Sequence, residues 1–257
     1  MIIDYYANYS RLSHLHPGEK AAFAFSHLLL VLFTKEIALS VYVFVLMGVV
    51  SVSYANIPFR TYRKLLLLPL IFLLFSLFPL LTSFAREGTE VDALVQTISV
   101  AGWFMYVSYS SLQQAVLLCV FAYAAVSCMY FFILTTPFHG IATLLRLLRL
   151  PEVFVELTAV TYRFIFVFIE KAAETYNAQR SRAGYNDLRS TFSSISMLVA
   201  NLFVQTMREA KDVQMAIDAR GGSEVEAGQM ISYPVRRDLW GAITVCLLIS
   251  CMVVYVF

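Results

Sequence analysis

Two arginines flanked by small residues form the most specific chemical pattern in the sequence. They lie in Ser181-Arg182-Ala183 and in Ala219-Arg220-Gly221, and the two arginines are 38 positions apart. Small neighbours leave a guanidinium unobstructed, and arginine is the side chain best suited to bidentate contacts with a carboxylate of another protein. Because an arginine near a helix end also interacts favourably with the helix dipole, by about 0.3–1 kcal/mol, either one alone could be only structural. The repetition favours a paired docking site.

Two long helices must position these arginines. The first shows apolar residues at steps of three and four, at Leu150, Phe154, Leu157, Thr161, Phe164 and Phe168, and a second pattern runs from Met197 to Asp212. Pro151 favours a helix start, and Gly184 and Gly221-Gly222 favour helix ends. The sequence therefore predicts amphipathic helices over Pro151–Arg182 and Leu188–Arg220.

The rest of the chain has the composition of a membrane protein. Of its 257 residues 60% are hydrophobic and only 14% are charged, and the mean hydropathy is +0.72. Apolar runs of about the length that crosses a bilayer as helix predict five spans, at 20–33, 37–54, 65–84, 111–134 and 239–257. The fold class expected is an all-α membrane protein, divided into residues 1–134, 135–237 and 238–257. The stretch 93–106 is compatible with an interfacial or re-entrant position, and its secondary structure stays open.

The basic residues are concentrated between the fourth and fifth predicted spans. Twelve of the 19 lysines and arginines lie within residues 137–238. With this region in the cytoplasm, five spans also place the N-terminus and the Arg60–Lys64 cluster there, and leave only Lys35 and Arg86 on outer loops. This arrangement follows the positive-inside rule. We expect a multi-pass protein of a prokaryotic cell membrane.

The sequence resembles the CbiQ/EcfT family, the transmembrane T components of energy-coupling factor transporters, whose coupling helices carry short motifs of the Ala-Arg-Gly kind. The resemblance extends in order over Thr135-Thr136-Pro137, Leu147–Pro151, Tyr162–Phe166 and Glu170-Lys171-Ala172. The N-terminal Ile3–Ala7 and Arg11–Lys20 resemble the cobalt-type branch in particular. In the first arginine triplet Ser181 replaces the usual alanine and Ala183 precedes Gly184, so this triplet departs from the common form of the motif, whereas Ala219-Arg220-Gly221 matches it.

The resemblance implies partners and roles for this chain. Each arginine triplet would dock one of two ATPase subunits, a CbiO-like homodimer, which would bind ATP and magnesium. A CbiM-like membrane subunit with a small CbiN-like subunit would capture Co²⁺, with nickel or a vitamin as the alternative cargo. Phe154, Phe164 and Phe168 would contact the substrate-binding subunit or the lipid surface. The chain itself would hold no catalytic residue, cofactor or metal, and no nucleic acid.

Other readings of the sequence are weaker. No G-x-x-x-x-G-K-[ST] motif occurs, so the chain has no recognisable phosphate-binding loop of its own. His14 and His16 could ligate a metal, but two ligands without nearby carboxylates or thiols are too few, and a structural role is expected. An intramembrane enzyme that uses Glu156, Glu170 or His139 is the alternative from another functional class. A self-contained carrier would show an internal repeat, and none is evident.

Overall fold

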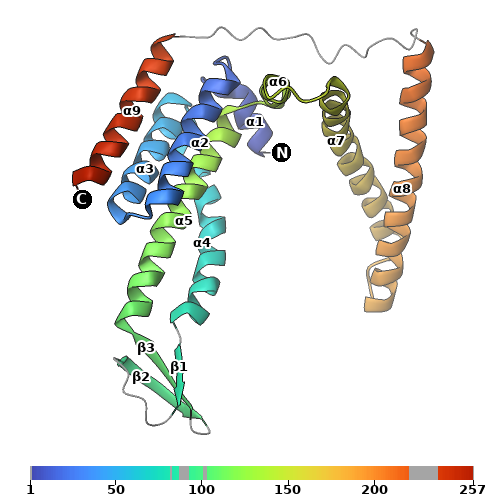
Figure 1. Cartoon of the computed structure of the whole chain (residues 1–257). Helices are drawn as coiled ribbons and strands as arrows, with labels where there is room; N and C mark the ends of the chain where they lie inside the picture. Colours follow the sequence, from blue (N-terminus) through green and yellow to red (C-terminus); the bar gives the residue numbers. More distant parts are fainter. Residues whose placement is uncertain (1, 82, 87–92, 101–102, 220–236, 257) are drawn as a thin grey trace. The chain divides into compact units, whose positions relative to one another are not determined.

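The computed structural model describes residues 2–81, 83–86, 93–100, 103–219 and 237–256. The chain separates into two compact units, one of Met1–Ile141 with Ser232–Phe257 and the other of Ala142–Ile231. The first unit is a helical bundle with a small sheet. The second is dominated by one long helical hairpin (Figure 1).

The bundle is built around α5 (Tyr109–Thr135), which packs against four other helices. These are α1 (Ile2–Tyr9), α2 (Pro17–Thr34), α3 (Ile37–Val49) and α4 (Phe59–Leu81). A π-helical turn, η1 (Val50–Tyr54), continues α3, and α9 (Arg237–Val256) packs on α2 and α3. A helix that is apolar on all sides, as α5 is, suits a position between other helices and lipid.

Each predicted span overlaps a helix of this bundle. Among the described residues, Ile37–Tyr54 and Ser111–Thr135 are long and apolar enough to cross a membrane, and α9 contains the shorter apolar stretch Ile243–Val253. The helix α4 continues through Pro69 and Pro79, as membrane helices tolerate. The structure therefore supports a membrane bundle, while the total of five spans stays a prediction.

The segment between α4 and α5 departs from the all-helical expectation. It forms a three-stranded antiparallel sheet in the order β1-β3-β2, from β1 (Ser83–Arg86), β2 (Ala93–Val100) and β3 (Trp103–Ser108). Valine, isoleucine, threonine and aromatic residues are frequent here, and these residue types favour strands. Residues 93–100 and 103–106 of the stretch that the sequence left open are therefore β-structure, and the predicted span to residue 84 ends in helix at Leu81.

One end of the bundle gathers segments that are distant in sequence. Tyr6 and Thr61 share a hydrogen bond of 3.1 Å between their hydroxyl oxygens, and the Arg11 backbone N–H donates to the Ala55 carbonyl at 3.4 Å. A small core of Ala55, Ile57, Tyr62 and Leu134 joins the start of α4 to the end of α5. The N-terminus, the basic start of α4 and the exit from α5 thus lie at the same end, as the predicted topology requires.

The second unit contains the two predicted long helices. They are α7 (Glu152–Ser181) and α8 (Leu188–Ala219), and α6 (Phe138–Leu147) lies between α5 and α7 in the sequence. Pro151 is the N-cap of α7, as expected for a residue type that is poorly tolerated in a helix interior. The predicted limits of both helices are confirmed to within one residue for the part of the chain that the structure describes.

Candidate partner-docking site on the α7–α8 hairpin

The first arginine triplet forms the end of α7. Arg182 is the C-cap residue, the Ala183 N–H donates to the Arg180 carbonyl at 3.1 Å, and the Gly184 N–H donates to the Gln179 carbonyl at 3.0 Å. These two bonds define a Schellman motif, which satisfies carbonyls that a helix end would otherwise leave unpaired. The backbone position of Arg182 is therefore fixed by hydrogen bonds on both sides of it.

The two residues after Arg182 meet different steric demands. Ala183 occupies the left-handed position with φ of 59°, a conformation that costs a residue with a side chain roughly 1–2 kcal/mol. At Gly184 a Cβ atom would lie 2.7 Å from Ser194 Oγ and 3.0 Å from the Gln179 carbonyl oxygen. The glycine therefore permits the close approach of α8 to the end of α7, and Ala183 carries the strained backbone.

Side chains of both helices lock this turn. Ser190 Oγ and Ser194 Oγ donate to the Gly184 carbonyl at 2.9 and 2.7 Å. Gln179 Nε2 donates to the Ser194 carbonyl at 3.0 Å, and Tyr185 OH donates to Gln179 Oε1 at 2.8 Å. Sequence reasoning singled out Gly184 as a helix stop but missed these polar partners, since their meeting depends on the antiparallel register of the hairpin.

The predicted docking residues of the first triplet are exposed on this turn. Ser181, Arg182 and Ala183 are all classed as exposed, and the Ser181 hydroxyl donates to the Asn177 carbonyl at 3.0 Å within α7. A flexible side chain on a fixed backbone loses less freedom on binding than one on a mobile loop. The turn can therefore present the Arg182 guanidinium to a carboxylate of a partner.

The second triplet begins at the opposite end of α8. Ala219 is the last residue of that helix and is exposed, whereas Arg220 and Gly221 lie outside the described residues. With 32 residues, α8 is about 48 Å long. Ala219 is therefore separated from the turn that carries Arg182 by the length of α8, and such a separation suits two distinct contacts.

The predicted phenylalanine contacts divide into two places. Phe164 and Phe168 line a shallow groove between α7 and α8, opposite Leu202, Gln205 and Glu209. Leu202 is the buried centre of this contact, with 4% of its surface exposed. Phe154, near the start of α7, is 51% exposed and is not part of the groove. Phe164 and Phe168 therefore contribute to the hairpin itself, and Phe154 alone stands apart from it.

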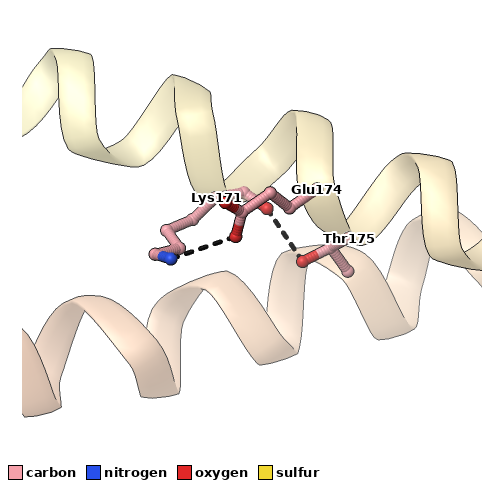
Figure 2. Close-up of polar contacts among 3 residues, drawn as sticks. All are labelled: Lys171, Glu174 and Thr175. Carbon is pink, nitrogen blue, oxygen red and sulfur yellow. Dashed lines mark hydrogen bonds and ion pairs between the residues drawn. The ribbon is translucent and has the colours of Figure 1, made fainter.

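A charged pair marks the rim of this groove. Lys171 Nζ and Glu174 Oε2 are 3.0 Å apart, and Thr175 Oγ1 donates to the Lys171 carbonyl at 2.8 Å (Figure 2). The hydrogen bond and the charge of Glu174 raise the pKa of Lys171. Lys171 and Glu174 thus form an ion pair on α7, and exposed pairs of this spacing contribute little to stability.

The histidine pair has a structural explanation. His16 is the N-cap of α2, and its Nδ1 accepts the Gly18 N–H at 3.1 Å, while His14 is exposed. An Nδ1 that accepts a backbone N–H satisfies one of the unpaired donors at a helix start. The structural role expected for His16 is confirmed.

The comparisons with known proteins identify the family. The family model described as CbiQ, cobalt transport protein, matches residues 9–230. The chain belongs to the CbiQ cobalt transport protein family. This family comprises transport subunits without catalytic activity of their own, so the intramembrane enzyme is no longer a competing reading.

Individual relatives agree with the family assignment. A cobalt transport protein CbiQ of Salmonella typhimurium is 22% identical over 82% of this chain and 92% of its own length. One of Rhodobacter capsulatus is 33% identical over 34% of this chain and 35% of its own length. A putative fused cobalt transport protein CbiMQ of Methanocorpusculum labreanum is 29% identical over 65% of this chain, and the match spans 27% of that protein. The fused relative therefore contains a CbiQ-like part beside a much longer remainder.

Proposed function

We propose that this chain is the energy-coupling membrane subunit of an ATP-driven cobalt uptake transporter. Two ATPase subunits bind through Arg182, at the end of α7, and Arg220, directly after Ala219 of α8, and a CbiM-like subunit that captures Co²⁺ packs against the membrane-facing side of the chain. The proposal rests chiefly on one observation, the exposed Arg182 on a turn whose backbone is held by a Schellman motif and by two serines of α8.

The hairpin is long and stiff enough to transmit a displacement along its length. Two helices of 30 and 32 residues transmit a displacement of one end to the other because backbone hydrogen bonds keep a helix stiff along its axis. When the ATPase subunits close on ATP, each docked arginine follows its subunit. The helices then move relative to the bundle, as rigid elements do in other domain transitions, and the substrate subunit is reoriented.

The partner assignment draws on the fused relative and on the exposed apolar side chains. The name of that relative joins CbiM and CbiQ in one protein. This favours an association between a CbiM-like subunit and this chain where the two are separate proteins. Phe154, with Val153 at 65% and Leu157 at 60% exposure, offers an apolar surface on the first two turns of α7. We assign this surface to the substrate subunit or the lipid, and we assign the hairpin and the N-terminus to the cytoplasm.

Co-purification from membranes tests the docking. The chain is expressed with its ATPase partners as wild type, Arg182→Ala, Arg220→Ala and the double variant, and the recovered ATPase is quantified. Arg180→Ala and Arg189→Ala are matched controls, because both arginines are exposed in the turns on either side of the motif. Removing one member of a desolvated charge pair weakens binding by about 30-fold or more.

Loss of ATPase recovery in the double variant, with normal membrane insertion and normal recovery in both controls, is the expected result. Full recovery in the double variant would show that the arginine triplets are not the docking residues. An equal loss in Arg180→Ala would assign the effect to general positive charge at this turn, which would also contradict the specific proposal.

A further inference from the structure

Lys20 is a buried lysine that joins three separate segments of the bundle. Only 4% of its surface is exposed. Its Nζ donates to the Thr135 carbonyl at 2.8 Å and to the Leu12 carbonyl at 3.1 Å. Thr135 is 115 residues away in sequence, so a single side chain connects the start of α2 to the end of α5 and to the segment before α2.

The Thr135 carbonyl is an unusual acceptor because it belongs to the last residue of α5. The final carbonyls of a helix have no partner within the helix and carry its partial negative charge. A lysine Nζ placed there satisfies the carbonyl and interacts favourably with the helix end. Around it, Thr135 and Thr136 are 0% and 2% exposed, so water does not offer a substitute partner.

The same junction is tightly packed on its other side. A Cβ atom on Gly140 would lie 3.1 Å from Thr136 Cγ2 and 3.4 Å from Pro17 Cβ. The Gly140 N–H donates to the Pro137 carbonyl at 2.9 Å, and the Ile141 N–H donates to the same carbonyl at 3.2 Å. The first turn of α6 is therefore held against the start of α2, next to the site where Lys20 holds the end of α5.

We propose that Lys20 is a positioning residue that clamps the α5–α6 junction, so that motion of the coupling hairpin is transmitted to α2 and α5. The inference rests on the proposed coupling function. Pro137 interrupts the backbone hydrogen bonding between α5 and α6, because proline has no N–H, and such a break is a natural hinge. With Lys20 in place the hinge is bridged. Without it, displacement of α6 is absorbed at residues 136–137.

The test compares cobalt uptake per ATP hydrolysed in the reconstituted complex. Lys20→Met keeps the length and apolar stem of the side chain but removes the donors, and Lys20→Arg restores donors. Lys64→Met is the matched control, because Lys64 is an exposed lysine near the same end of the bundle. Gly140→Ala is a second, independent variant: it leaves the Lys20 side chain intact and disturbs the packing of α6.

Hydrogen exchange at the Gly140 and Ile141 amides gives a local readout that does not depend on transport. We expect Lys20→Met to accelerate this exchange about tenfold and to lower uptake per ATP about tenfold, with ATPase binding retained. Lys20→Arg should recover most of both values, Gly140→Ala should lower uptake per ATP, and Lys64→Met should leave both unchanged.

Unchanged uptake per ATP in Lys20→Met and Gly140→Ala would overturn the proposal. A second result would also overturn it: uptake that falls only in proportion to the amount of folded protein and that Lys20→Arg does not restore. Such a result indicates a lysine that serves stability alone. If Lys20→Met does not insert, Lys20→Gln, which also removes the ammonium group, takes its place in both measurements. Failure of the wild type to transport with its ATPases would contradict the coupling function itself, whereas the exchange measurement would still report on the clamp.

Discussion

Replacing Gly184 by alanine should loosen the α7–α8 hairpin at its turn. The added Cβ would lie 2.7 Å from Ser194 Oγ and 3.0 Å from the Gln179 carbonyl oxygen, and the second of these atoms belongs to the backbone. Relief of the first contact requires Ser194 to move. That movement breaks its 2.7 Å hydrogen bond to the Gly184 carbonyl and disturbs the 3.0 Å bond between Gln179 Nε2 and the Ser194 carbonyl.

The size of the effect follows from these contacts. Overpacking a close contact costs about 1–3 kcal/mol, and each hydrogen bond lost contributes about 1 kcal/mol, with partial relief by relaxation. We expect the free energy of local opening of the hairpin to fall by about 2–4 kcal/mol. At about 1.4 kcal/mol per factor of ten, amide hydrogen exchange in the first turns of α8 should accelerate about 30-fold to 1000-fold.

The assay is hydrogen exchange on the full chain in detergent or nanodiscs, read by mass spectrometry over α7 and α8. Gly241→Ala is the matched control, since a Cβ there meets no atom within 4 Å. Removing Ser194 Oγ in the Gly184→Ala/Ser194→Ala double variant relieves the closer contact, so the two changes should be less than additive. Wild-type exchange in Gly184→Ala, or strict additivity in the double variant, would refute the close-contact argument.

Three further predictions concern the same hairpin. Ala183→Gly should slow exchange at the turn several-fold, because glycine adopts φ of 59° without the cost of a side chain; faster exchange would contradict the Schellman geometry. Leu202→Ala should destabilise the hairpin by about 2–5 kcal/mol in the same measurement, and Phe203→Ala, at 64% exposure, should change it little; equal effects would refute the packing assignment. The small difference in protection between wild type and Lys171→Met should stay constant between about pH 6 and pH 9. Because the pKa of Lys171 is raised, its pairing with Glu174 is present throughout this range and is lost only as pH rises through the raised value, so a difference that changes near neutral pH would contradict this assignment.

The sequence predicted the coupling region well because strong local signals mark its limits. Pro151 fixes the start of α7, and Gly184 with its small and polar neighbours fixes the turn before α8. The apolar period of 3.6 residues predicted that the segments between these limits are helices. The family resemblance, carried by short motifs in the same region, is confirmed by the match over residues 9–230.

Other features could not be read from local pattern. The strands between residues 83 and 108 depend on pairing between β1 and β3 across the chain, and their aromatic and β-branched content also fits a membrane interface. The hydrogen bond between Lys20 and Thr135 joins residues 115 positions apart, and no periodicity in the sequence indicates this contact. The apolar period correctly placed Phe164 and Phe168 on one face of α7, but these side chains line a groove with α8 of the same chain.

Cobalt uptake into proteoliposomes tests the coupling function most directly. Vesicles containing the chain, its ATPase subunits and the substrate subunit are supplied with ATP and radioactive Co²⁺, beside vesicles that lack the chain or carry Arg182→Ala/Arg220→Ala. ATP-dependent uptake is expected only in the complete wild-type complex, with none from the chain alone. Uptake by the purified chain without ATPase subunits, or undiminished uptake in vesicles that lack the chain, would contradict the coupling function.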